Sequence, residues 1–195
     1  MISIEELEKV LSKYRINKPK YRGTSVEHKS LPSMLTTFRE LIVDDIPPTQ
    51  TEFLENFRKK YPDIRFRGVP SRLKRAYLSY VREYHLGFLL RAQFDTVIYD
   101  EKTDLFGVDY IIQYRDHKFN IHAFVNTENG KYWRSIKNGR HNFVGHHLDL
   151  PMNLDSGKRV GKFIFYTEDD VKLLKEQMDI IVEGEANEKV EDWRV

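Results

Sequence analysis

The stretch that decides the fold covers residues 104–137 and reads DLFGVDYIIQYRDHKFNIHAFVNTENGKYWRSIK. Two runs within it, residues 108–114 and 119–125, are rich in β-branched and aromatic residues and flank the polar turn RDHK, which predicts a β-hairpin. The first run contains an acid, Asp109, that the hairpin would bury. A buried carboxylate is costly unless a metal, a cation or hydrogen bonds compensate it. Asp109 is therefore a candidate functional residue.

The second run carries a histidine in an equally apolar setting. Alternation along a strand places Asn120, His122 and Phe124 on one face. Neutral imidazole is a ligand for zinc, manganese or iron, whereas magnesium prefers oxygen. His122 is either such a ligand or a core histidine satisfied by a hydrogen bond.

A basic segment follows the hairpin and is predicted to be a helix over residues 132–141. It places cations beside the aromatic residues Tyr132 and Trp133. Cations contact phosphates and aromatic rings stack on unpaired bases, although a buried core position is the commoner place for Tyr and Trp. We expect nucleic-acid contacts from Arg134, Arg140 and His141 of this segment.

Working outward from this stretch, helical spacing of apolar residues predicts helices over 4–14, 35–43, 49–61 and 71–93, the first and third with capping boxes. Further strands are predicted over 96–99 and 162–166, and a last helix capped by Thr167 runs to residue 182. The expected fold is α/β of the α+β type: a helical N-terminal part, then helix, three-stranded antiparallel meander, helix, strand and helix. The expected domains are a helical extension over 1–70, an α/β core over 71–182 and an acidic tail over 183–195.

Composition limits the classes of protein. The chain of 195 residues contains no cysteine, which excludes disulfides, thiolate metal sites and cysteine nucleophiles. The formal net charge is only +2, but residues 57–93 hold ten Lys and Arg against two acids, and residues 163–195 hold ten acids against four Lys and Arg. We expect a basic surface, with Arg72 and Arg75 contacting a polyanion, or simply solvated helix faces. No signal peptide or membrane span is evident, and a cytoplasmic protein is expected.

The order of elements and the position of Asp109 in FGVDYII are similar to the core of the restriction-endonuclease-like, or PD-(D/E)XK, nuclease superfamily. The resemblance covers about residues 71–181. It implies a divalent Mg²⁺ or Mn²⁺ ion held by Asp109, by Glu83 from the preceding helix, and by His122. The acid-x-Lys motif of the third strand is not matched, because His122 stands at the acid and Phe124 at the lysine.

Because the third strand lacks the lysine of the acid-x-Lys motif, the resemblance implies that another residue supplies this cation. Lys137 follows Arg134 by one helical turn, so it could reach the same pocket from the helix. The catalytic residues implied are thus Asp109, His122, Lys137 and Glu83.

Each of these residues also has a structural alternative. Asp109 could pair with Arg115 or cap a turn, and Glu83 could form an ion pair with Arg75. His141, His146 and His147 could join Asp149 in a zinc site, but their spacing fits no standard signature and a polar surface loop is expected.

Three functions remain open from the sequence. The first is a metal-dependent DNA endonuclease of a phage, mobile element or defence system. The second is a nucleic-acid-binding or assembly protein that keeps the fold without chemistry. The third is a protein-interaction module whose basic and acidic surfaces pair between chains, as in a homo-oligomer.

Overall fold

The computed structural model describes residues 2–19, 31–64, 68–99, 107–137 and 143–192. The chain divides into two compact units. The N-terminal unit comprises Met1–His85 and Arg159–Phe165, and the C-terminal unit comprises Leu86–Lys158 and Tyr166–Val195. Helix α4, Val69–Gln93, contributes its first part to one unit and its last part to the other.

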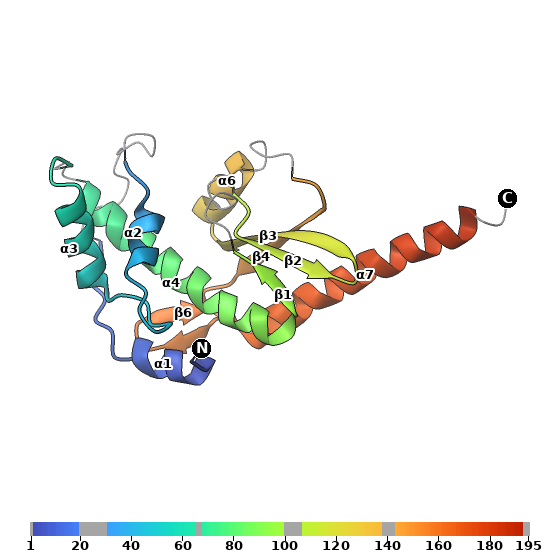
Figure 1. The fold of residues 1–195 in the computed structure, drawn as a ribbon, viewed down its shortest axis with the longest axis horizontal. Coiled ribbons are helices and arrows are strands. Elements are labelled where there is room, and N and C mark those ends of the chain that lie inside the picture. Colours follow the sequence, from blue (N-terminus) through green and yellow to red (C-terminus); the bar gives the residue numbers. More distant parts are fainter. Residues whose placement is uncertain (1, 20–30, 65–67, 100–106, 138–142, 193–195) are drawn as a thin grey trace. The chain divides into compact units, whose positions relative to one another are not determined.

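The N-terminal unit is mainly helical (Figure 1), with α1 (Ile4–Leu11), α2 (Met34–Glu40), α3 (Gln50–Lys60), the first part of α4, and the strand β6 (Phe163–Phe165). Two predicted capping boxes are confirmed. The Ser3 side chain accepts from the Glu6 amide while the Glu6 carboxylate accepts from the Ser3 amide, and Thr49 and Glu52 repeat the arrangement at α3. These bonds satisfy amides that a helix start would otherwise leave without partners.

Aromatic side chains form the core of the N-terminal unit. Phe38, Phe53 and Tyr77 are almost fully buried and meet with ring centroids about 6 Å apart. His85 stacks on Phe165 with a centroid distance of 4.0 Å. This packing joins β6 to the helices although nearly eighty residues separate them along the chain.

The C-terminal unit is built on a four-stranded sheet in the order β1-β2-β3-β4. The three pairings are antiparallel for β1 with β2 and β2 with β3, and parallel for β3 with β4. A parallel pair needs a crossover connection, and α6 supplies it. The bounds are β1 Thr96–Ile98, β2 Tyr110–Tyr114, β3 His117–Val125, α6 Glu128–Lys137 and β4 His146–Met152.

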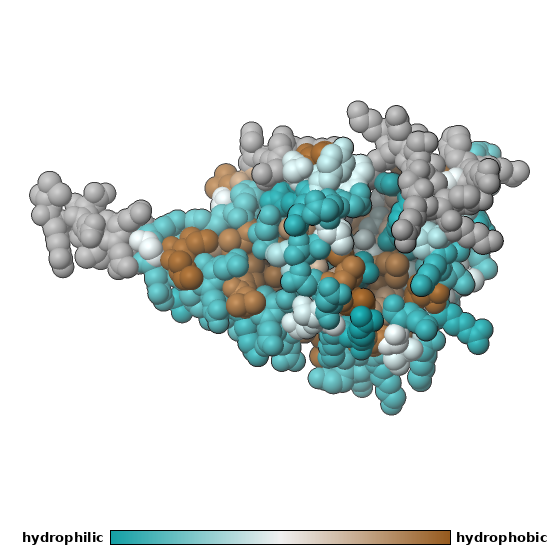
Figure 2. All heavy atoms as spheres, turned by 180° about the vertical axis from the view of Figure 1, so that it is seen from behind, coloured by the Kyte–Doolittle hydropathy of each residue, from teal (hydrophilic) through white to brown (hydrophobic). Residues whose placement is uncertain are grey.

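Helices cover both faces of this sheet. Arg134 of α6 pairs with Asp149 of β4, whereas Glu185 of α7 (Glu168–Asp192) faces His146. His146 and Asp149 are three positions apart on one strand and so lie on opposite faces. Apolar patches run along α7 in Figure 2, and Ile180, at 70% exposure, is one of its exposed apolar residues.

The expected mixed α/β fold class and the predicted hairpin are confirmed. The helix expected over 132–141 is α6, which begins four residues earlier at Glu128, and the last helix, expected to end at residue 182, continues to Asp192. One expectation about this region is wrong, because the segment of His146 and His147, expected to be a polar loop, forms β4. The strand expected over 162–166 is confirmed as β6, which pairs with β5 (Lys158–Val160) in a separate two-stranded sheet. None of the helices in the described ranges is long and apolar enough to cross a membrane.

Candidate functional site

A row of polar side chains crosses β3 and β4 on the face covered by α6. In the parallel register Asn120 faces His147 and His122 faces Asp149. Asn120 and His122 are buried, with exposures of 0% and 1%. Buried polar groups require hydrogen-bond partners, so the arrangement of this row is constrained.

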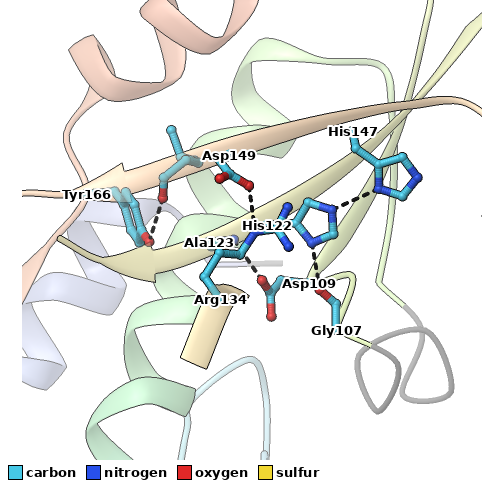
Figure 3. A network of polar contacts seen from close by, with 9 residues as sticks. Gly107, Asp109, His122, Ala123, Arg134, His147, Asp149 and Tyr166 are labelled. Atoms are coloured by element: carbon cyan, nitrogen blue, oxygen red, sulfur yellow. Dashed lines mark hydrogen bonds and ion pairs between the residues drawn. The ribbon is translucent and has the colours of Figure 1, made fainter. Parts of the chain in front are cut away.

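His122 lies at the centre of the network in Figure 3. Its Nδ1 lies 2.7 Å from the carbonyl oxygen of Gly107, and its Nε2 lies 2.9 Å from Nδ1 of His147. The carbonyl can only accept, so His122 Nδ1 carries a proton. Burial, opposed by this hydrogen bond, is the main reason that the His122 pKa falls to about 4, and the Arg134 charge lowers it further. His122 is thus a neutral imidazole at neutral pH.

The protons of the histidine pair follow from this assignment. Since neutral His122 accepts at Nε2, Nδ1 of His147 must donate to it. Nε2 of His147 in turn lies 3.0 Å from the carbonyl oxygen of Phe143 and 3.5 Å from Nδ2 of Asn120. His147 thus links buried His122 to the residue segment that precedes β4.

The Asp109 carboxylate is connected to His122 through the backbone of Ala123, the residue that follows His122. Its Oδ2 accepts from the amide of Ala123 at 2.7 Å, and its own amide donates to the Ile121 carbonyl at 2.9 Å. Asp109 directly precedes β2, whose first residue, Tyr110, pairs with Ile121. These two hydrogen bonds hold the 4%-exposed Asp109 carboxylate against β3.

Among the described residues, Arg134 brings a cation to this row. Its Nε lies 2.6 Å from Oδ1 of Asp149, and the Arg134 side chain is 12% exposed against 49% for Asp149. Tyr166, at the other side of the network, donates to the carbonyl of Leu150 at 3.2 Å (Figure 3). Arg134 thus approaches the sheet while its carboxylate partner stays open to solvent.

Two aromatic residues of the same helix point outward. Tyr132 is 59% exposed and Trp133 is 50% exposed, and their rings meet edge to face at 5.5 Å. Lys131 beside them is also exposed. The commoner expectation of buried rings is therefore wrong for both, and nothing in the sequence pattern distinguished them from core aromatics.

The other predicted site residues are distributed as follows. Glu83, Arg72 and Arg75 lie on the part of α4 that belongs to the N-terminal unit. The Nε of Arg72 is buried, and desolvation lowers the pKa of its guanidinium. Arg140 and His141 lie outside the described residues, as does the side chain of Lys137 at the end of α6.

A Mg²⁺ or Mn²⁺ ion held by Asp109 and His122 does not fit this arrangement. Both ring nitrogens of His122 are engaged, one with Gly107 and one with His147, so neither is directed at an ion. Over the described part of the chain, the histidine and acidic groups that converge at ligand spacing are His117, His146 and Glu185 instead. A metal at Asp109 would require His147 to release His122.

Comparisons with family models, with curated proteins and with solved structures each returned no match. The resemblance to the PD-(D/E)XK superfamily accordingly stays a prediction.

Proposed function

We propose that this chain binds nucleic acid through the outer surface of α6, with Tyr132 and Trp133 stacking on unpaired bases. The observation that carries the proposal is the exposure of these two rings, 59% and 50%, on a helix that also exposes Lys131 beside them. Exposed neighbouring aromatics are unfavourable in water, and a bound base would cover them.

The charges around the rings suit a phosphate backbone. Lys131, which is 57% exposed, precedes Tyr132. Arg134 follows Trp133 and reaches the edge of this surface through its pair with the half-exposed Asp149. Stacking requires a base that is free of its own neighbours, so single strands or unpaired ends are the expected ligands in preference to intact duplex.

The test is the binding of a fluorescein-labelled single-stranded oligonucleotide, followed by anisotropy. Trp133→Ala and Tyr132→Ala should each weaken binding about 5- to 150-fold, the equivalent of about 1 to 3 kcal/mol per stacked base. Ile180→Ala, which removes an exposed apolar side chain from α7, is the matched control and should bind like the wild type.

Affinity should also fall as salt rises, because phosphate contacts release counterions. Binding that is absent in the wild type, or that is equal in wild type and both aromatic variants, would overturn the proposal.

A second candidate function is metal-dependent hydrolysis of DNA by a PD-(D/E)XK-type site. It is supported by the neighbouring positions of Asp109 and His122 and by an antiparallel β1-β2-β3 arrangement followed by a helix and a parallel strand. The engaged nitrogens of His122 and the apolar Phe124 at the lysine position stand against it. For these reasons we place it second.

Plasmid nicking with Mg²⁺ or Mn²⁺ separates the two candidates. If the nuclease candidate is right, the wild type nicks plasmid, Asp109→Ala does not, and Asp95→Ala, which removes an exposed acid elsewhere in the same unit, remains active. Binding without nicking in any of the three proteins leaves the nucleic-acid-binding function and excludes the nuclease.

A further inference from the structure

Three metal-ligating side chains converge on the sheet face opposite the His122 network. They come from the first residue of β3, the first residue of β4 and the helix α7: His117, His146 and Glu185. Their ligand atoms all lie within 4.8 Å of one another. We propose that these three residues bind a late first-row divalent metal ion of the zinc class.

The sheet brings the two histidines together. Parallel neighbours begin at the same edge of a sheet, and His146 pairs in register with Phe119, two residues beyond His117. His117, Phe119 and His146 therefore share one face. The two imidazole centroids lie 5.7 Å apart, and the buried Phe119 ring lies 5.0 Å from that of His146 and forms an apolar wall.

Glu185 completes the set from α7. One carboxylate oxygen lies 3.5 Å from Nδ1 of His117, and the other lies 3.2 Å from Nε2 of His146. Zinc bonds of about 2.0 to 2.2 Å in a tetrahedron place neighbouring ligand atoms about 3.3 Å apart. The two distances to Glu185 are close to that spacing, and all three ligand atoms lie within 4.8 Å of one another, so side-chain rotations can bring them around one ion.

Contacts of Asp179, which lies N-terminal to Glu185 on the same helix, hold α7 in place. Asp179 accepts from the Tyr114 hydroxyl at 2.7 Å and pairs with Arg115 at 3.1 Å, which anchors the helix to the end of the β2–β3 hairpin. Glu185 follows less than two turns later. The position of its carboxylate is thus set by packing that does not depend on the metal.

The donor set selects the class of metal. Two imidazoles and one carboxylate suit zinc and its late first-row neighbours, while magnesium and calcium prefer oxygen alone. The side chains are 21%, 28% and 40% exposed for His117, His146 and Glu185, so solvent can reach the ion. Three protein ligands leave a position for water. The bound ion would fasten α7 to the sheet.

The test uses untagged, chelator-treated full-length protein titrated with Zn²⁺ by calorimetry. The wild type should bind one Zn²⁺ per chain and melt at a higher temperature with it, and Mg²⁺ should do neither. Glu185→Gln and His146→Asn should each bind at least tenfold more weakly. Glu183→Gln removes the same charge at an exposed position on the same helix and should bind like the wild type.

Circular dichroism checks that each variant is folded. Because Glu185 is 40% exposed, Glu185→Gln decides the matter even if His146→Asn does not fold. Visible d–d absorption of bound Co²⁺, lost in Glu185→Gln, would report the same site. The proposal is overturned if the wild type takes up no Zn²⁺, if Glu185→Gln binds Zn²⁺ as the wild type does, or if Mg²⁺ binds equally well. If Glu185 only forms ion pairs with the two histidines and the cluster has no affinity for metal, the wild type takes up no Zn²⁺, which is the first of these outcomes.

Discussion

Acidification should unfold the protein partly through His122. The folded state lowers the His122 pKa from 6.5 to about 4, with burial as the largest cause. A depressed histidine pKa means that the unfolded chain takes up a proton that the folded chain excludes. The contribution of neutral His122 to the free energy of unfolding is complete above pH 6.5 and is lost as pH falls toward 4. At about 1.4 kcal/mol per pKa unit, the total is about 3 kcal/mol, of which about 2.5 kcal/mol is lost by about pH 4.5.

The assay is urea denaturation at several values between about pH 7.5 and 4.5. Other groups also titrate in this interval, so the informative quantity is the difference between the wild type and His122→Gln. The variant should be less stable at neutral pH but should lose about 2.5 kcal/mol less on acidification. Gln113→Ala removes an exposed side chain without a titratable group from the neighbouring strand β2; it is the control and should follow the wild type.

Equal losses of stability in the wild type and His122→Gln would refute the reasoning. So would an imidazole pKa of His122 near 6.5 in an NMR titration. Either result would mean that burial does not hold His122 neutral in the folded protein.

Two further predictions test the fold around the site. Gly145→Ala should destabilise the protein by more than about 1 kcal/mol in thermal or urea unfolding, because Gly145 has φ +112° and a Cβ there would lie within 2.4 Å of the Lys118 carbonyl; an unchanged midpoint would contradict the close approach of this turn to β3. Tyr166→Phe should cost about 1 kcal/mol, because a buried hydroxyl that donates to Leu150 is removed while the ring remains; wild-type stability would argue against that bond.

Local signals in the sequence predicted the parts of the fold that depend on neighbouring residues. The capping residues Ser3 and Thr49 begin helices as expected, and the turn after Tyr114 joins the predicted hairpin. In that turn Arg115 and Asp116 adopt positive φ, which a two-residue hairpin turn requires.

Strand β4 could not be predicted in the same way. It contains two histidines, an aspartate and Pro151, and its outward positions are exposed, so it lacks the apolar run of a buried parallel strand. Its pairing with β3 depends on the crossover through α6, which no local pattern specifies.

The same distinction between local and long-range signals applies to the candidate site. Asp109 and His122 were identifiable because each is polar within an apolar run. Their partners Ala123, Gly107 and His147 were not, because two are backbone groups and the third lies on the missed strand. The exposure of Trp133 likewise depends on which face of α6 meets the sheet.

The most direct test of the central proposal is the fluorescence of Trp133 itself. The chain has two tryptophans, so Trp193→Phe leaves Trp133 as the single emitter. A single-stranded oligonucleotide should quench this emission in a saturable manner, and added salt should reverse the quenching, because stacking brings a base onto the indole while phosphates contact the nearby cations. Emission that stays constant at oligonucleotide concentrations that saturate binding in anisotropy, or the absence of any binding, would contradict the account.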